Sequence, residues 1–178
     1  MPRSAPAVVT ILVQEVGGDV VFSYGGPGQS LDLTGAVTLP PDPGFPTDGY
    51  VFPSKGYFQN NPLGISIQRY QAVTAPAFGP GFFFYGTSMG SALIVRPDEL
   101  VLDPAYTSGS EFGVGSITVS GTLASRGISI SPNPLPLLTL PSGDTVVMSV
   151  IPSVSVPEPS RALLLCLGAL ALVARRHR

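Results

Sequence analysis

The chain has 178 residues, of which 44% are hydrophobic and 11% are charged, and it contains 21 glycines and 20 prolines. This hydrophobicity argues against a disordered protein, and the frequent turn residues favour one folded, turn-rich β domain with a sizeable core. Residues 1–160 hold five basic and eleven acidic groups, a net charge of −6, which excludes the basic surface that nucleic-acid binding requires.

The first half of the chain predicts strands separated by glycine and proline turns. Apolar and polar residues alternate over Ala7–Val16, as is typical of a half-buried strand. Gly17 and Gly18 then predict a hairpin turn into a second strand, Val20–Tyr24. The proline-rich stretch 40–46 is expected to be a surface loop, because proline donates no ladder hydrogen bond. Two further strands are expected within Ser30–Leu39 and Gly56–Gln71.

The second half continues the same pattern. Strands are expected at Phe82–Tyr85 and Ser91–Val95, paired as a hairpin, and at Glu99–Leu102, Gly115–Leu123 and Asp144–Ile151. No stretch before residue 160 has convincing helical spacing. The predicted fold is therefore an all-β, antiparallel, jelly-roll-like β-sandwich over residues 1–152, which we favour over a barrel.

The last 25 residues have a different composition. A linker, 153–160, contains the motif Val156, Pro157, Glu158, Pro159 and Ser160, and an apolar run, Ala162–Ala174, leads to Arg175, Arg176, His177 and Arg178. Segment 161–178 is therefore expected to form a single C-terminal hydrophobic helix with a basic end. Three arginines, Arg175, Arg176 and Arg178, are expected to stop this helix in a membrane and to orient it with the body outside the cytoplasm. The run would make about 20 Å of helix, against a hydrocarbon core of about 30 Å, so a buried core helix is the alternative.

This order of motif, hydrophobic helix and arginine-rich end resembles a PEP-CTERM sorting signal, over the last 23 residues of the chain. The resemblance implies export across the inner membrane of a Gram-negative bacterium that makes extracellular polysaccharide. It also implies processing near Pro157–Ser160 by an exosortase, a membrane enzyme similar to a cysteine transpeptidase. The implied partners are that enzyme and, transiently, the inner membrane, and extracellular polysaccharide is a candidate partner at the final location, the cell surface or the extracellular matrix.

Export also requires an N-terminal signal. The residues before Ala7–Val13 contain no separate apolar segment and cleavage site. We therefore expect the true start of the protein to lie upstream of Met1.

One motif suggests catalysis but lacks the partners that catalysis needs. Gly86-Thr87-Ser88-Met89-Gly90 matches G-x-S-x-G, the nucleophile elbow of α/β-hydrolases, and is similar to the serine region of subtilisin-like proteases. Both chemistries need a histidine to accept the serine proton. The sole histidine, His177, lies beyond the proposed membrane segment, so we expect Ser88 not to be catalytic.

Metal and acid chemistry have weak support. The sole cysteine is Cys166, in the apolar run, which excludes a thiolate or histidine zinc site in the body. The densest acidic group, Asp98, Glu99 and Asp103, is expected to be a solvated loop rather than a glycosidase pair. A weak calcium site is left open, with carboxylates drawn from Asp42, Asp48, Asp98 or Asp103. No metal and no cofactor are expected.

The aromatic residues allow two interpretations. They would form either a carbohydrate-stacking surface or part of the core, and the core is the commoner role for such residues. Three successive phenylalanines cannot all face one side of a strand, so one is expected to be exposed. The residues concerned are Tyr50, Tyr57, Tyr70, Phe78, Phe82, Phe83, Phe84 and Tyr85.

The sequence as a whole predicts an exported, non-enzymatic envelope or matrix protein that is sorted through its tail. The alternatives are a secreted hydrolase with an unrecognised active site and a simple membrane-anchored surface binding protein. A tail-anchored cytoplasmic protein would place the arginines outside, against the charge rule.

Overall fold

The computed structural model describes residues 6–40, 48–62, 68–74 and 77–151. The described residues form strands and one short 3-10 turn, η1 (Pro53–Lys55), with no α-helix among them, so the predicted all-β class is confirmed. The predicted linker 153–160 and helix 161–178 lie outside these residues. The strands are β1 (Val8–Val16), β2 (Asp19–Tyr24), β3 (Thr38–Leu39), β4 (Gly49–Phe52), β5 (Tyr57–Asn60), β6 (Gln68–Gln71), β7 (Val73–Thr74), β8 (Phe84–Gly90), β9 (Leu93–Arg96), β10 (Glu99–Leu102), β11 (Gly115–Ser120), β12 (Leu135–Thr139) and β13 (Thr145–Val150).

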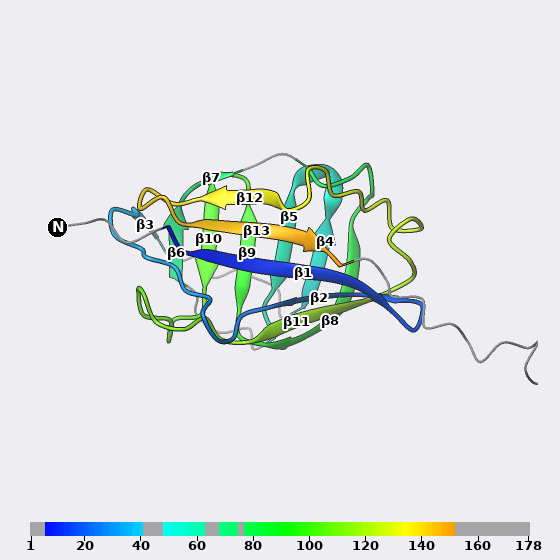
Figure 1. Ribbon diagram of the computed structural model, residues 1–178, viewed down its shortest axis with the longest axis horizontal. Helices are drawn as coiled ribbons and strands as arrows, with labels where there is room; N and C mark the ends of the chain where they lie inside the picture. Colours follow the sequence, from blue (N-terminus) through cyan, green and yellow to red (C-terminus); the bar gives the residue numbers. More distant parts are fainter. Residues whose placement is uncertain (1–5, 41–47, 63–67, 75–76, 152–178) are drawn as a thin grey trace, which may run out of the picture.

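All the strands belong to one curled sheet. Their order is β3-β6-β10-β9-β5-β4-β8-β11-β2-β1-β13-β12-β7. Neighbouring strands are antiparallel except β1 and β13, which run parallel from Val8 beside Thr145 to Val13 beside Val150. The prediction of a purely antiparallel sheet is therefore wrong in this pair, and Figure 1 shows the two strands, blue and orange, side by side. Sequence alternation alone predicts strands but not the direction of their partners.

Strand β8 forms the corner of the curled sheet. Its first residues, 84–86, pair with β4, and its last residues, 87–90, pair with β11. Gly86 and Gly49 are partners at this junction, and both lie against the side chain of Ile117. A Cβ atom at Gly86 would lie 2.5 Å from Ile117 Cγ2. The two glycines therefore give β11 the space to pack on the corner.

The core lies inside the curl of the sheet, between strands β1, β2, β12 and β13 on one side and strands β4, β5, β9 and β10 on the other. Figure 1 shows β1, β2, β12 and β13 crossing in front of β4, β5, β9 and β10. Phe22 of β2 meets Phe58 of β5 across this space, with ring centroids 5.8 Å apart. The alternation predicted for the first strand is confirmed, because Val9, Ile11 and Val13 are fully buried. Removal of these apolar side chains from water is the main driving force for the fold.

Two local predictions differ from the structure. The hairpin between Phe82–Tyr85 and Ser91–Val95 is wrong, because β8 continues through the G-x-S-x-G stretch and β9 pairs with β5 and β10 instead. The strand expected within Ser30–Leu39 is reduced to β3, Thr38–Leu39. Upstream of it, the backbone N–H of Leu31 bonds to a side chain, the Tyr106 hydroxyl, rather than to a neighbouring strand.

Candidate binding surface

Aromatic side chains gather on the outer face of the corner where β4, β5 and β8 meet. We call this group the aromatic surface, and it consists of Tyr50, Phe52, Tyr57, Phe83 and Tyr85. The intervening residues Val51, Phe58 and Phe84 point the other way, into the core. Because successive side chains of a strand face opposite sides, each strand contributes to both the core and the aromatic surface.

Strand register brings these rings together. Tyr50 of β4 lies opposite Tyr85 of β8, and Phe52 lies opposite Tyr57 of β5. The rings of Tyr50 and Tyr57 are stacked, with centroids 4.8 Å apart and an interplanar angle of 18°. Phe83 meets Tyr85 edge to face at 4.6 Å and Tyr50 at 5.0 Å. The rings therefore form one continuous cluster rather than isolated surface residues.

Much of this cluster is in contact with solvent. Tyr85 is 66% exposed and Phe83 41%, and the neighbouring Phe82 is 85% exposed. Phe78 and Phe84, in contrast, are buried in the core. The aromatic run is thus divided between the core and the solvent-exposed surface, and the expectation that a phenylalanine would be exposed is confirmed. These exposed rings make the aromatic surface a candidate for binding, because large contiguous apolar patches are uncommon on soluble proteins.

A polar edge borders the stacked tyrosines. The Tyr57 hydroxyl accepts hydrogen bonds from Tyr50 Oη at 2.5 Å and Arg96 Nε at 2.8 Å, and it donates to Gln59 Oε1 at 3.1 Å. Partial burial, and then the Tyr50 hydrogen bond, hold the pKa of the Tyr57 phenol above its ordinary value. This hydroxyl therefore stays protonated at neutral pH.

Charged side chains hold that edge in place. The guanidinium carbon of Arg96 lies 5.5 Å from the centre of the Tyr57 ring. The buried carboxylate of Glu99 forms ion pairs with Arg96, at 3.5 Å, and with Arg69. The predicted solvated acidic loop is therefore wrong for Glu99, which lies between two arginines. The ion pair between Glu99 and Arg69 could not be predicted from local spacing, because the two residues are thirty positions apart in the sequence.

The suspected nucleophile has a structural partner. Ser88 Oγ donates a hydrogen bond to Asn60 Oδ1, inside a network that also includes Tyr24. No histidine occurs among the described residues, since His177 lies outside them. In the described part of the chain, nothing adjacent to Ser88 supplies the base that acyl transfer needs.

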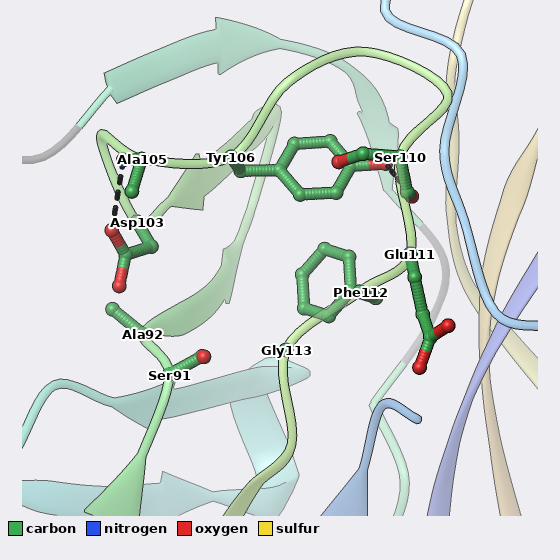
Figure 2. A pocket seen from close by; sticks show the side chains of 9 residues that line it. All are labelled: Ser91, Ala92, Asp103, Ala105, Tyr106, Ser110, Glu111, Phe112 and Gly113. Carbon is green, nitrogen blue, oxygen red and sulfur yellow. Dashed lines mark hydrogen bonds between the residues drawn. The ribbon is translucent and has the colours of Figure 1, made fainter. Parts of the chain in front are cut away.

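A pocket lined by both polar and aromatic side chains lies at the end of β10. Figure 2 shows Asp103 and Glu111 on opposite sides of the rings of Tyr106 and Phe112. These rings pack at 4.9 Å, and Asp103 Oδ1 accepts a hydrogen bond from its own loop, from the N–H of Ala105 at 2.9 Å. The Tyr106 hydroxyl is hydrogen-bonded to both the N–H and the C=O of Leu31. The central side chains of this pocket are thus engaged in holding loops together.

The calcium candidates do not come together in the part of the chain that the structure describes. Among those residues, no group of three or more acidic, histidine or cysteine side chains is placed to hold a metal ion. Asp98 occupies a left-handed turn position with φ of 61° before β10, and Asp103 follows the same strand. Asp48 precedes β4, and Asp42 lies outside the described residues.

The predicted tail residues all lie outside the described ranges. These are the motif residues Val156, Pro157, Glu158, Pro159 and Ser160 and the orienting arginines Arg175, Arg176 and Arg178. Within residues 6–40, 48–62, 68–74 and 77–151, no helix is long and apolar enough to span a membrane.

Comparisons with known proteins add no relative. No family model matches the sequence, and neither the curated proteins nor the solved structures yielded a match.

Sequence reasoning missed one component of this region. Arg126 lies beside Phe82 and Phe83, in a hollow that adjoins the aromatic surface. The sequence places Arg126 in a glycine- and serine-rich turn far from the phenylalanines. The alternation of Tyr50 with Phe52 and of Phe83 with Tyr85 was a usable signal for the rings, but not for the arginine.

Proposed function

We propose that this chain is an exported, non-enzymatic protein of the cell envelope or extracellular matrix whose body binds polysaccharide. The observation that carries the proposal is the aromatic surface, with Tyr85 and Phe83 exposed beside Phe82. Flat aromatic faces attract the C–H-rich faces of sugar rings and give a large contact area with few rotatable bonds. The hydroxyl group of the exposed Tyr85 supplies hydrogen bonds to sugar hydroxyl groups.

In this proposal, the tail is a PEP-CTERM sorting signal. Strand β13 ends at Val150, six residues before the motif begins at Val156. A signal placed so close behind the last described strand is consistent with an address attached to a jelly-roll-like β-sandwich. Pro157 and Pro159 keep the motif extended, since proline neither continues a helix nor allows the preceding residue to do so readily.

The remaining tail residues have separate roles in the proposal. The helix over 161–178 holds Pro157–Ser160 at the outer surface of the inner membrane, and Arg175, Arg176 and Arg178 fix its orientation. An exosortase then recognises the motif at a fixed depth and processes the chain. The membrane contact is therefore transient, and the body passes to the cell surface or matrix.

Replacement of the motif tests the tail. In an exosortase-bearing host, with a signal peptide fused at the N-terminus, Pro157-Glu158-Pro159 is changed to Ala-Ala-Ala. We expect unprocessed protein retained in the membrane, whereas the parent chain is shortened near Ser160, as measured by mass spectrometry. Retention of the parent chain at full length would instead identify a simple membrane-anchored protein.

Affinity electrophoresis tests the body. The full chain in a neutral detergent is run through gels that contain either neutral or acidic soluble polysaccharides. We expect at least one polymer to retard it, and we expect the Phe83→Ala/Tyr85→Ala variant to lose the retardation. Val114→Ala is the control, because Val114 is 65% exposed but is not part of the aromatic surface. Equal mobility in every gel would contradict polysaccharide binding.

A further inference from the structure

A hollow beside the aromatic surface has walls of two different kinds. Phe82 and Phe83, from the segment before β8, line it together with Ser125 and Arg126, from the turn after β11. Phe83 also belongs to the aromatic surface, where it meets Tyr50 and Tyr85. Phe83 therefore connects the hollow to the aromatic surface.

Arg126 is held in place by its Nε group, which leaves its terminal Nη groups available to a ligand. Its Nε donates to the carbonyl oxygen of Ser120 at 2.5 Å, and its guanidinium carbon lies 5.5 Å from the centre of the Phe84 ring. Neither of the ion pairs among the described residues includes Arg126. Its two terminal Nη groups make no hydrogen bond to any described residue. A fixed guanidinium without a carboxylate partner attracts an anion.

The hollow is built on close backbone contacts, which keep its two walls in register. The N–H of Gly81 donates to the carbonyl oxygen of Gly127 at 3.0 Å. A Cβ atom at Gly81 would lie 2.0 Å from the carbonyl oxygen of Arg126, and one at Gly79 would lie 2.0 Å from that of Gly127. Only glycine permits this approach, so the phenylalanine wall and the arginine wall are pre-organised for a ligand.

We propose that this hollow binds an acidic polysaccharide, with a uronic acid unit stacked on Phe82 and Phe83 and its carboxylate bound by Arg126. A planar guanidinium matches the two oxygens of a carboxylate, whereas a neutral sugar leaves the charge of Arg126 unused. This inference rests on the proposed polysaccharide binding and adds the ligand class and the specificity residue. Because residues 1–160 carry a net charge of −6, the attraction for a polyanion has to be local.

Two polymers with the same backbone separate the contributions. The full chain in a neutral detergent is titrated with polygalacturonate and with its methyl-esterified form, in which the carboxylates are neutral. We expect esterification to weaken binding about tenfold, the effect of losing a charged hydrogen bond. Arg126→Gln should lose this discrimination, Arg126→Lys should retain part of it, and Phe82→Ala should weaken binding of both polymers. Val73→Ala, at another strongly exposed apolar position outside the hollow, should change neither.

The outcomes distinguish the proposal of an acidic ligand from the broader proposal that the body binds polysaccharide. Equal binding of both polymers, dependent on Phe82 but not on Arg126, would overturn the acidic ligand and leave polysaccharide binding standing. Binding of neither polymer by the parent chain would overturn the acidic ligand. If, in addition, no polysaccharide gel retards the chain, the proposed function of the body fails as well.

Discussion

The amide of Asn60 and the hydroxyl of Tyr24 meet across the core, with Asn60 Nδ2 donating to Tyr24 Oη at 2.6 Å. The two hydrogens of this amide are shared among Tyr24 and the carbonyl oxygens of Met89, at 2.9 Å from Nδ2, and Ser91, at 3.1 Å. Tyr24 in turn donates to the Ser91 carbonyl oxygen at 2.5 Å. One buried asparagine thus ties β5 to β2 and to the end of β8, behind the corner that carries the aromatic surface.

We predict that Asn60→Leu destabilises the fold by about 3 kcal/mol, because several buried polar groups lose their partner at once. Urea denaturation of the full chain in detergent, followed by far-ultraviolet circular dichroism, measures this loss. Ser88→Ala removes one hydroxyl from the same network and should cost about 1 kcal/mol. A loss below 1 kcal/mol for Asn60→Leu would contradict the structural role of the network.

The corner of the sheet predicts a second effect. Gly86→Ala should destabilise the protein by about 2–3 kcal/mol, because the new methyl group meets Ile117 Cγ2 at 2.5 Å and the Thr118 carbonyl oxygen at 2.7 Å. Gly28→Ala is the control, since Gly28 has nothing within 4 Å and carries only a left-handed φ of 78°. Its cost should be about 1–2 kcal/mol. If Gly28→Ala destabilises the protein as much or more, the contact of the new methyl group with Ile117 does not explain the effect of Gly86→Ala.

The ion pairs behind Tyr57 predict a third effect. Glu99→Gln should destabilise the fold by about 2–4 kcal/mol, because Arg69 and Arg96 are left facing each other without their shared carboxylate. Thermal denaturation measures the change. Glu111→Gln removes an exposed carboxylate with no ion pair to a described residue and should shift the midpoint little. A shift no larger than that of this control would mean that Glu99 contributes no net stability.

Stability should also fall at alkaline pH. Burial raises the pKa of Tyr24 above the ordinary tyrosine value of 10.0, more than its hydrogen bond from Asn60 lowers it. Because the folded pKa lies above the unfolded pKa, this stability is fully present below pH 10 and is lost as the pH rises further. Tyr24 should contribute a decrease of about 1.4 kcal/mol per pH unit.

The measurement is the urea midpoint between pH 8 and pH 11. Tyr24→Phe should be less stable than the parent chain at pH 8, since it loses the hydroxyl, yet its stability should decrease less steeply above pH 10. If the urea midpoints of the two chains fall equally steeply above pH 10, Tyr24 does not cause the loss of stability at alkaline pH.

Regular alternation made part of the fold predictable. Val9, Ile11 and Val13, like Ile117 and Val119, follow a period of two and are all fully buried, so β1 and β11 were predicted closely. The hairpin turn at Gly17 and Gly18 was also predicted, and both residues have positive φ. Local spacing is enough to predict a strand wherever one face of the strand is buried and the other is exposed to solvent.

Other elements depend on partners that local spacing does not reveal. Strand β12 was missed because Pro136 interrupts its pattern, and a register shift follows at Leu138. The glycines of the G-x-S-x-G stretch suggested a turn, whereas Gly86 lies inside a strand to make room for Ile117. In the candidate site, the exposed phenylalanine was predictable, but Arg126 was not, because only the tertiary fold brings it into the same hollow as Phe82 and Phe83.

If the aromatic surface is the binding face of the body, a bound ligand lies against it. ¹H–¹⁵N spectra of the full chain in detergent are recorded during titration with a galacturonic acid oligosaccharide. We expect the shifts to concentrate at Tyr50, Phe82, Phe83, Tyr85 and Arg126. Shifts centred instead on Asp103 and Tyr106, or no saturable shifts at all, would contradict it.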